Sequence, residues 1–503
     1  MMRSITCTRS ALAILAVISM ASAVFAQPEP GDVFKEYYHS CKVNGGCNCG
    51  GDTKRLGSGY GAVSPLSFTP TGDVDITGAT KAEIFIEITE CHEGTRGLQA
   101  KVNDGTWIDP VLPVSNFYEM AHFWFPVFPV DLADVKEGQN TITLRVSGGG
   151  SPTPQMLVVG THLRVYYDPA SKAHIDAGIT APAPGEATGK ECNLVCSASG
   201  ATKVEFLGLY EGVNWEGDGD FTQWHYTYFH GEFERHIGTD SVGPDFQVTW
   251  NTEWVPDQTG AKLAARVHGS DGTIYMTEVV DNIQICRPDM TVELGIPDPM
   301  EGWVTRNSGD KTQTFILGGD PADILGATVF ERGWGDYNPE LVLNGTVLGR
   351  SAGGGYNFNF TEFAIDAAKA RSIFKSGSNS IMMKKGGHHG HEAYYPGMMT
   401  VVQFSASNDC ANIAVSAKEP VRRGIAKDNL RIMSSGNTLA FNVLSDRAGT
   451  ISLATLNGIE VAAKKVARRG TYSIDTSNMP NGVYLLKLRD GASEIVRKVS
   501  IAR

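Results

Sequence analysis

The sequence lacks the features that mark a membrane protein or a helical protein. After the apolar run near its N-terminus, no stretch reaches the roughly 18 apolar residues that a membrane helix needs. Few stretches show helical periodicity, whereas short alternating runs are frequent and the chain holds 57 Gly and 23 Pro. The sequence therefore predicts an all-β protein, and its length indicates about three or four domains.

Familiar catalytic signatures are missing as well. The sequence has no Gly-x-Ser-x-Gly elbow and no His-Glu-x-x-His motif. Acidic residues are abundant, but no spacing selects the two carboxylates that a glycosidase needs. Gln27 would be the first mature residue, where a lytic polysaccharide monooxygenase needs His, and a second histidine cluster for a two-site copper monooxygenase is absent. An enzyme is therefore not identified, although a carbohydrate-active or metal-dependent hydrolase stays an alternative.

Residues 1–26 are predicted to be a signal peptide. Arg3 and Arg9 precede an apolar run, and the segment closes on Val24-Phe25-Ala26, where a signal peptidase would cut. No cysteine follows that site to carry a lipid anchor, so we expect an exported chain with no transmembrane segment after cleavage. Removing the two arginines takes the formal charge from -12 to -14. A surface this acidic disfavours nucleic acid and anionic polymers as partners.

Eight of the nine cysteines lie in the predicted mature chain, and an even number in an oxidising compartment indicates disulfide bonds. The sequence does not decide their pairing. They are Cys41, Cys47, Cys49, Cys91, Cys192, Cys196, Cys286 and Cys410. The alternative is a metal site in which His39 and His92 join the N-terminal thiols.

The strand and turn pattern divides the mature chain into units. Residues 31–168 and 291–407 are each predicted to form a jelly-roll-like sandwich, on either side of an Ig-like sandwich at 171–290. Residues 408–428 read as a linker of mixed charge. The middle unit is similar to an Ig-like module of uncharacterised secreted bacterial proteins through His236-Ile-Gly-Thr239, Trp250 to Gln258 and Ala265-Arg266, and this resemblance implies no activity.

The third unit reads as a repeat of the first. In both, one strand ends in Asn followed by a turn, and a later strand begins Gly-x-Asn-x-Ile. The paired asparagines are Asn103 and Asn140 in the first unit and Asn344 and Asn379 in the third, with separations of 140 - 103 = 37 and 379 - 344 = 35. This pattern resembles galactose-binding-like jelly rolls that bind glycans, although it is loose enough to arise in other sandwiches.

The C-terminal residues 429–503 contain short strands separated by turns, with Asn457-Gly458 as a hairpin signal. Leu456-Asn457-Gly458, the strand from Asn481 to Leu485 and the final Arg497-Lys498-Val499 resemble the type A sorting domain of the type IX secretion system of Bacteroidetes. The resemblance implies a small β-sandwich, recognition by the type IX translocon, proteolytic removal of the domain, and a location outside the cell or on the surface of a Gram-negative bacterium. The alternative is one more Ig-like module.

The most unusual cluster lies in the third unit, between Gly386 and Pro396. His388 and His391 could hold a transition metal, since imidazole suits Zn and Cu, but adjacent histidines on an extended chain point to opposite faces. Flat rings stack on sugars, and amides or carboxylates bond their hydroxyls. The residues that we predict to contact a glycan are Trp334, Tyr337, Asn338, Glu340, His389, His391, Glu392 and Tyr394.

A second candidate site lies in the middle unit, where oxygen-bearing side chains recur at every second residue. These are Asn214, Glu216, Asp218 and Asp220, with glycines at 217 and 219. The spacing is typical of the first half of an acidic calcium loop, although the bidentate Glu of the full pattern is missing, and the alternative is a solvated turn. Ca²⁺ is therefore the one cofactor that the sequence predicts.

Together these patterns predict a secreted, multi-domain all-β protein that binds glycan or adheres at the cell surface, with polysaccharide as its partner beside the translocon. The alternatives are the hydrolase named above and a structural surface protein without a small ligand.

Overall fold

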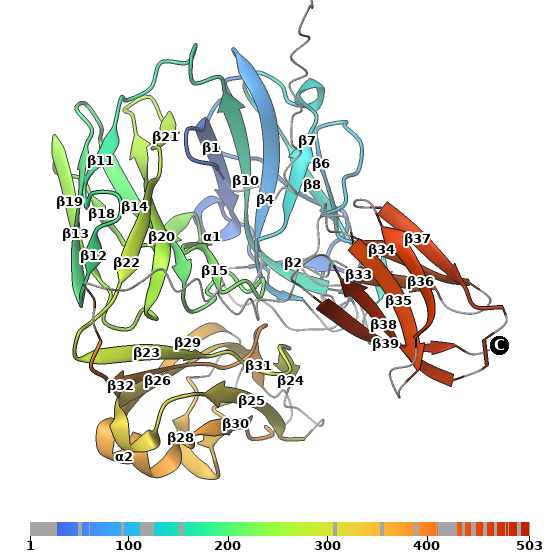
Figure 1. The fold of residues 1–503 in the computed structure, drawn as a ribbon. Helices are drawn as coiled ribbons and strands as arrows, with labels where there is room; N and C mark the ends of the chain where they lie inside the picture. The colour runs from blue at the N-terminus through green and yellow to red at the C-terminus, as the bar shows by residue number, and fades with distance from the viewer. Residues whose placement is uncertain are drawn as a thin grey trace, which may run out of the picture.

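The computed structural model consists mainly of antiparallel sheets, which confirms the all-β, multi-sandwich class (Figure 1). The structure describes residues 28–48, 53–59, 61–91, 95–110, 125–149, 155–304, 309–335, 337–352, 357–386, 391–408, 410, 430–434, 438–443, 449–455, 460–466, 470–477, 479–480, 482–489 and 494–501. The predicted signal peptide, most of the linker, His388 and His389 lie outside these residues. No described helix is long and apolar enough to cross a membrane.

The first unit is a sandwich built on two long strands that pair over most of their length. Its elements are β1 (Val33–Ser40), α1 (Cys41–Asn44), β2 (Lys54–Gly57), β3 (Leu66–Phe68), β4 (Ala79–Cys91), β5 (Thr95–Arg96), β6 (Gln99–Val102), β7 (Val127–Val130), η2 (Leu132–Asp134), β8 (Ile142–Arg145), β9 (Gly148–Gly149) and β10 (Gln155–Tyr167). The sheet β3-β8-β6 packs over β1-β10-β4-β7, and their inward apolar side chains form one core.

The middle unit is also a two-sheet sandwich, and it shares a sheet with the first. Its strands are β11 (Gly178–Ala181), β12 (Ala187–Thr188), β13 (Glu191–Ser197), β14 (Lys203–Glu211), β15 (Thr222–Trp224), β16 (Thr227–Phe229), β17 (Glu232–Glu234), β18 (Gly238–Asp240), β19 (Asp245–Asn251), β20 (Gln258–His268), β21 (Ile274–Met276) and β22 (Val280–Ile285). Because β21 pairs with β1, a 12-stranded sheet runs through both units without a break.

The third unit repeats the strand order of the first. It contains β23 (Met290–Gly295), β24 (Trp303–Val304), β25 (Lys311–Leu317), η3 (Pro321–Asp323), β26 (Ile324–Gly335), β27 (Glu340–Leu343), β28 (Thr346–Arg350), β29 (Asn357–Asp366), α2 (Ala367–Ile373), β30 (Gly377–Met383), β31 (His391–Ala393) and β32 (Met399–Ser405). The sheet β25-β30-β27-β28 faces a six-stranded sheet around β26, and a single core lies between them.

The paired asparagines make the same hydrogen bonds in the two repeats. Asn103 Nδ2 donates to Asn140 Oδ1 at 2.8 Å, and Asn344 Nδ2 donates to Asn379 Oδ1 at 2.7 Å. Each first asparagine has a positive φ, 49° at Asn103 and 48° at Asn344. Its side-chain oxygen accepts from the backbone N–H of the residue directly after its partner, Thr141 or Ser380. A short polar side chain tolerates this left-handed turn and satisfies the backbone around it.

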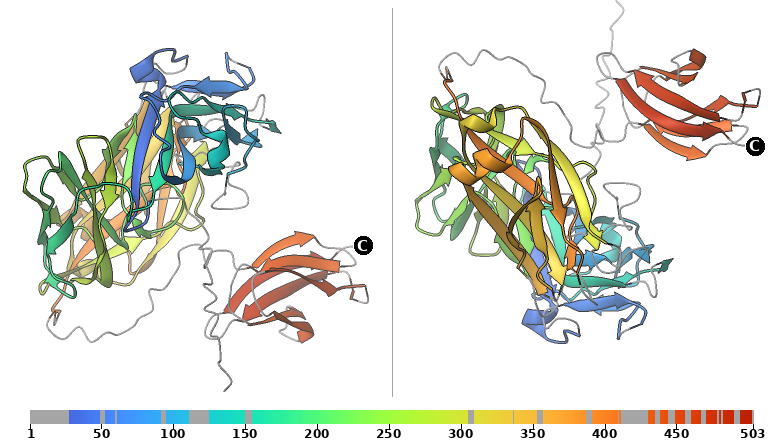
Figure 2. Two further views of the ribbon diagram at one scale, coloured as in Figure 1. Left: turned by 90° about the horizontal axis from the view of Figure 1, so that it is seen from above. Right: turned by 90° about the horizontal axis from the view of Figure 1, so that it is seen from below.

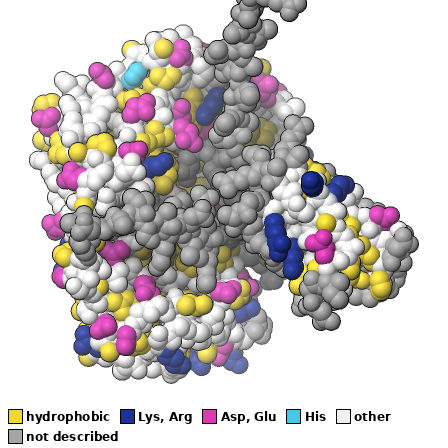
Figure 3. Space-filling view, viewed as in Figure 1, with side chains coloured by type: hydrophobic (Ala, Val, Ile, Leu, Met, Phe, Trp, Pro, Cys, Tyr) yellow, Lys and Arg dark blue, Asp and Glu magenta, His cyan; other side chains and the backbone are white. Residues whose placement is uncertain are grey.

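The units are joined by apolar contacts as well as by the shared sheet. One cluster joins the first and middle units, a second joins the middle and third, and a third brings together Leu157, Phe229 and Trp334 from all three. Figure 2, which gives views from above and below, shows that each unit borders the other two. Acidic side chains are spread singly over the visible face in Figure 3.

Two disulfide bonds form, and two described cysteines stay unpaired. Cys41 bonds to Cys47 beside α1, and Cys286 bonds to Cys410, which ties the end of the third unit back to the end of the middle one. Cys192 and Cys196 are free and buried on the same face of β13. Residues four apart on a strand are separated by about 13 Å, which is too far for a bridge. The expectation that all eight mature cysteines are in disulfides is therefore wrong for this pair.

The C-terminal unit is a small sandwich with its own core. Its strands are β33 (Leu430–Ser434), β34 (Thr438–Val443), β35 (Gly449–Thr455), β36 (Glu460–Val466), β37 (Gly470–Asp475), β38 (Gly482–Arg489) and β39 (Glu494–Ile501). They form the sheets β33-β34-β37 and β36-β35-β38-β39. Ile451 and Leu453 point into the core, as their alternation predicts, whereas the predicted Asn457-Gly458 turn lies outside the described residues.

Candidate functional site

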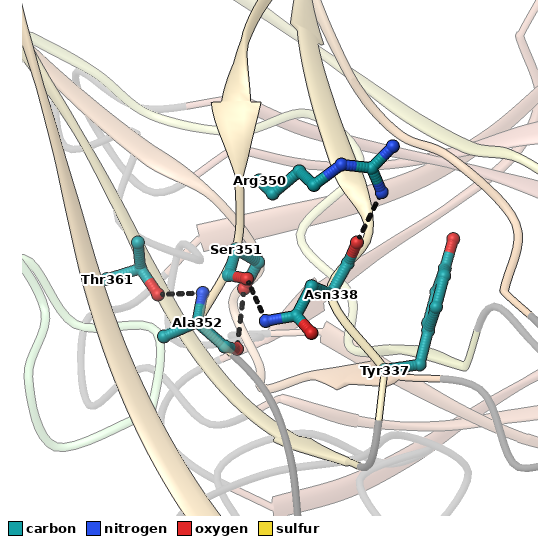
Figure 4. A pocket seen from close by; sticks show the side chains of 6 residues that line it. All are labelled: Tyr337, Asn338, Arg350, Ser351, Ala352 and Thr361. Atoms are coloured by element: carbon teal, nitrogen blue, oxygen red, sulfur yellow. Dashed lines mark hydrogen bonds between the residues drawn. The ribbon is translucent and has the colours of Figure 1, made fainter.

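A groove opens in the third unit where β28 ends and β29 passes beside it. Its volume is about 640 Å³, and its lining residues are Tyr337, Asn338, Arg350, Ser351, Ala352 and Thr361 (Figure 4). The lining combines one aromatic ring with an amide, a guanidinium and two hydroxyl-bearing residues. Two of the residues predicted to contact a glycan, Tyr337 and Asn338, therefore lie here.

The hairpin of β27 and β28 fixes the charged side of the groove. Its turn at Asn344-Gly345, together with a β-bulge between Leu341 and Val342 in the register, sets Glu340 opposite Arg350. The guanidinium donates to Glu340 Oε1 at 2.7 Å and to the carbonyl of Asn338 at 2.9 Å. The amide of Asn338 in turn donates to the carbonyl of Ser351 at 3.1 Å. Glu340, a third predicted residue, therefore reaches the groove through its bond to Arg350.

Tyr337 is held by its hydroxyl and keeps part of its ring exposed. The hydroxyl donates to the carbonyl of Lys385 at 2.5 Å and lies 3.2 Å from that of Lys384, beyond the end of β30. Burial raises the pKa of Tyr337, so the phenol stays protonated and able to donate at neutral pH. A flat ring tethered at its tip is a pre-ordered contact surface.

A buried ion pair lies directly beneath this lining. His391 Nε2 contacts Glu331 Oε1 at 2.8 Å, and both residues are fully buried. His391 Nδ1 contacts the backbone carbonyl of Tyr337 at 3.1 Å. Because both ring nitrogens face acceptors, this geometry favours the charged form of the imidazole. Burial opposes that charge, but Glu331 outweighs it and raises the pKa of His391.

The arrangement around Ser351 does not form a nucleophile. Its hydroxyl donates to Glu331 Oε2 at 2.5 Å, and His391 Nε2 lies 3.4 Å away. A serine nucleophile passes its proton to an imidazole, whereas the Ser351 hydroxyl donates to Glu331 and the near ring nitrogen of His391 also faces that carboxylate. The three residues therefore set the shape of the groove floor rather than supply a catalytic group.

Three other predicted glycan contacts are buried away from the groove. The rings of Trp334 and Tyr394 are 5% and 1% exposed and lie in the core cluster that joins the three units. Glu392 is 5% exposed on β31. The interpretation of these residues as a ligand-facing surface does not fit their burial, because a sugar cannot stack on a ring that other side chains cover. The prediction for His388 and His389 falls outside the described residues.

The predicted calcium loop is closed by its own hydrogen bonds. Asn214 Nδ2 donates to Asp218 Oδ1 and to the carbonyl of Asp220, both at 2.6 Å. Glu216 points inward, where it accepts from the backbone of Tyr226 and from Gln223. Burial raises the pKa of Asp218 to about 6. Across the described part of the chain, no three His, Cys, Asp or Glu side chains gather to hold a metal ion, and calcium binding stays a prediction.

A second buried charge cluster lies between the first and middle units. Glu36 on β1 accepts from Arg164 on β10 at 2.7 Å and from Arg266 on β20 at 2.8 Å. Glu83 and Tyr228 complete the network. Burial alone would raise the pKa of Glu36, but the two guanidiniums outweigh it and hold the pKa well below its usual range. These are fully paired charges that tie two units together.

Sequence reasoning missed Arg350, Ser351, Thr361 and Glu331. For Arg350, the Asn344-Gly345 turn alone would place Gly349 opposite Glu340, and a β-bulge in the hairpin brings Arg350 to that position instead. The others depend on how β26, β29 and β31 lie beside that hairpin, which the sequence does not fix. The groove is therefore a product of tertiary packing.

Comparison with known families assigns the C-terminal unit alone. Residues 426–502 match the secretion system C-terminal sorting domain. These residues direct export by the type IX secretion system, so the protein is secreted or held at the cell surface of a Bacteroidetes-type Gram-negative bacterium. The predicted sorting domain is thus confirmed. No curated protein matches the chain.

Two solved structures are weakly similar to parts of this chain. A β-porphyranase of glycoside hydrolase family 86 from Bacteroides plebeius is 12% identical with a TM-score of 0.20, over 47% of this chain and 38% of that one. A β-glucuronidase from Ruminococcus gnavus is 13% identical with a TM-score of 0.16, over 38% of this chain and 36% of that one. This chain thus spans well under two thirds of either protein, and likeness at this level carries no functional argument.

Proposed function

We propose that this protein, which its sorting domain directs out of the cell, binds carbohydrate in the groove of the third unit. The observation that carries the proposal is the lining itself. An exposed part of the Tyr337 ring stands beside the Asn338 amide and the Arg350 guanidinium, with Thr361 across from them. This is the combination of one apolar surface and several fixed polar groups that sugar rings require.

The same lining favours binding over hydrolysis. Glycosidases use two carboxyl groups on either side of the scissile bond. Among the described residues at this groove, the carboxylates are Glu340, which is neutralised by Arg350, and Glu331, which is buried beneath the floor and paired with His391. Neither is placed to protonate a leaving group, to attack the anomeric carbon or to activate a water molecule that attacks it. The export route supports the proposal, because polysaccharides are abundant outside the cell.

Affinity gel electrophoresis on a panel of plant and microbial polysaccharides tests the proposal with the full chain. We expect retardation by at least one polymer, and a loss of about tenfold in affinity for Tyr337→Ala, the scale of an aromatic hot spot. Val347→Ala is the matched control, because Val347 is 50% exposed on β28 and does not line the groove. Equal retardation of Tyr337→Ala and the wild type would exclude this groove.

A further inference from the structure

The first unit carries, on the outer face of its sheet β3-β8-β6, a polar row that matches the one beside the groove. Gln99 precedes Asn103 by four residues, just as Glu340 precedes Asn344 by four. Asp109 follows Asn103 by six residues, just as Arg350 follows Asn344 by six. Ala100 pairs with Ile108, so Gln99 faces Asp109 as Glu340 faces Arg350. Gln99 Nε2 donates to Asp109 Oδ1 at 2.9 Å.

The third member of the row is a cation in both repeats. Arg145 on β8 is the cross-strand partner of Gln99 on β6. Arg145 follows Asn140 by five residues, and Lys384 follows Asn379 by the same number in the third unit. Strands β6 and β8 lie side by side on the flank of the first unit (Figure 1). The guanidinium of Arg145 donates from Nε and Nη2 to Gln99 Oε1 at 2.8 and 2.6 Å. Its partner is therefore a neutral amide.

An aromatic ring completes the row in the first unit. Trp107 is half-buried, with the guanidinium of Arg145 4.1 Å and the ammonium of Lys101 5.3 Å from its ring centre. In the described part of the chain neither cation makes an ion pair with a carboxylate. Cations over a ring fix its orientation by cation–π attraction, and here they also place positive charge beside the indole.

We propose that Trp107, Lys101 and Arg145 form a second carbohydrate-contacting site, which takes a sugar bearing a carboxylate or sulfate group. The ring of Trp107 contacts the apolar face of the sugar, the two cations bind its anionic group, and the Gln99 amide orients Arg145. The formal net charge of -12 repels anionic polymers from the surface as a whole, so this site is a local exception. The proposal rests on the proposed function.

Two sites on one rigid body have a measurable consequence. The first and third units are packed together through the cluster of Leu157, Trp334 and Tyr394, so their sites are held at a constant separation. A polymer that reaches both sites is bound with an effective concentration set by that separation, and its avidity exceeds that of either site alone. Loss of one site therefore weakens binding without abolishing it.

Affinity gels containing polygalacturonate, a carrageenan or a neutral glucan separate the alternatives, with the full chain in each. We expect Trp107→Ala to lower affinity for a charged polymer by about tenfold, Trp107→Phe to restore most of it, and Asp109→Asn to strengthen it. Polygalacturonate and carrageenan distinguish carboxylate from sulfate as the group bound. Unchanged melting temperatures show that the variants are folded.

The outcomes separate this inference from the proposed function. If Trp107→Ala has the same affinity as the wild type for every polymer while Tyr337→Ala loses affinity, the second site is wrong and the groove is supported as the binding site. If only Trp107→Ala loses affinity, the second site stands and the groove is wrong. If Trp107→Ala loses as much affinity for the neutral glucan as for the charged polymers, the proposal that the ligand is anionic is wrong. If no polymer retains the wild type, both proposed sites are wrong.

Discussion

At the scale of single residues, the ion pair beneath the groove should have a large effect on stability. His391→Ala leaves the Glu331 carboxylate buried without its imidazolium, and breaking a buried pair in this way costs about 3–5 kcal/mol. Chemical denaturation followed by fluorescence measures the loss. A change of under about 1 kcal/mol, the range of exposed pairs, would contradict the assignment of these residues as a buried charged pair.

The same pair gives stability a pH dependence of defined sign. The pKa of His391 is raised above the unfolded value of about 6.5. The stabilisation is therefore fully present below that value and is lost as pH rises through the folded pKa. We expect the difference in unfolding free energy between wild type and His391→Gln to shrink as the pH rises above about 6.5. A difference that grows with pH would show that the imidazole is neutral in the fold.

At the scale of secondary-structure elements, the two asparagine pairs should contribute alike. Asn103→Ala and Asn344→Ala each remove a side chain that bonds three backbone or side-chain groups at a positive φ. We expect each to lower the unfolding free energy by about 2–4 kcal/mol. Asn193→Ala, at an exposed position on β13, is the control and should change it little. Unequal losses at the two asparagines would mean that the repeats are not equivalent.

Elements with a local signal were the ones that the sequence predicted best. Alternation gave the strands around Ile451 and Leu453, and the Asn-Gly turn gave the hairpin beside the groove, because both depend on neighbouring residues. Trp334 and Tyr394 are predicted from the sequence to face a ligand, because no local signal indicates that they are buried. Their burial depends on Leu157 and Phe229 from two other units, and no periodicity within the third unit reports that contact.

At the scale of the whole molecule, the network around Glu36 should make the first and middle units unfold together. Arg266→Met removes a guanidinium that bonds Glu36 across the interface and Tyr228 within the middle unit. The change leaves a buried carboxylate with less compensation and costs about 3–5 kcal/mol. Scanning calorimetry should show one transition for these units in the wild type and two in the variant. A loss of about 3–5 kcal/mol in unfolding free energy shifts the melting temperature by several degrees. A single transition shifted by less than about 1 °C would therefore contradict this role.

The three-unit arrangement itself was only partly visible in the sequence. Composition and turn spacing separated the first, middle and third units, and the C-terminal motifs identified the export signal. The continuous sheet through β21 and β1 was not visible, because strand pairing between units leaves no pattern in either strand alone. Nor did the sequence indicate the groove, whose walls come from separate strands of one unit.

The central claim is that the exported body binds carbohydrate without cleaving it. Isothermal titration calorimetry, with the polymer that the affinity gels select injected into the full chain, tests it most directly. We expect heats that decline to saturation for the wild type, and an affinity about tenfold lower for Tyr337→Ala. Sustained heat after each injection, the signature of turnover, would contradict it, as would heats that Tyr337→Ala leaves unchanged.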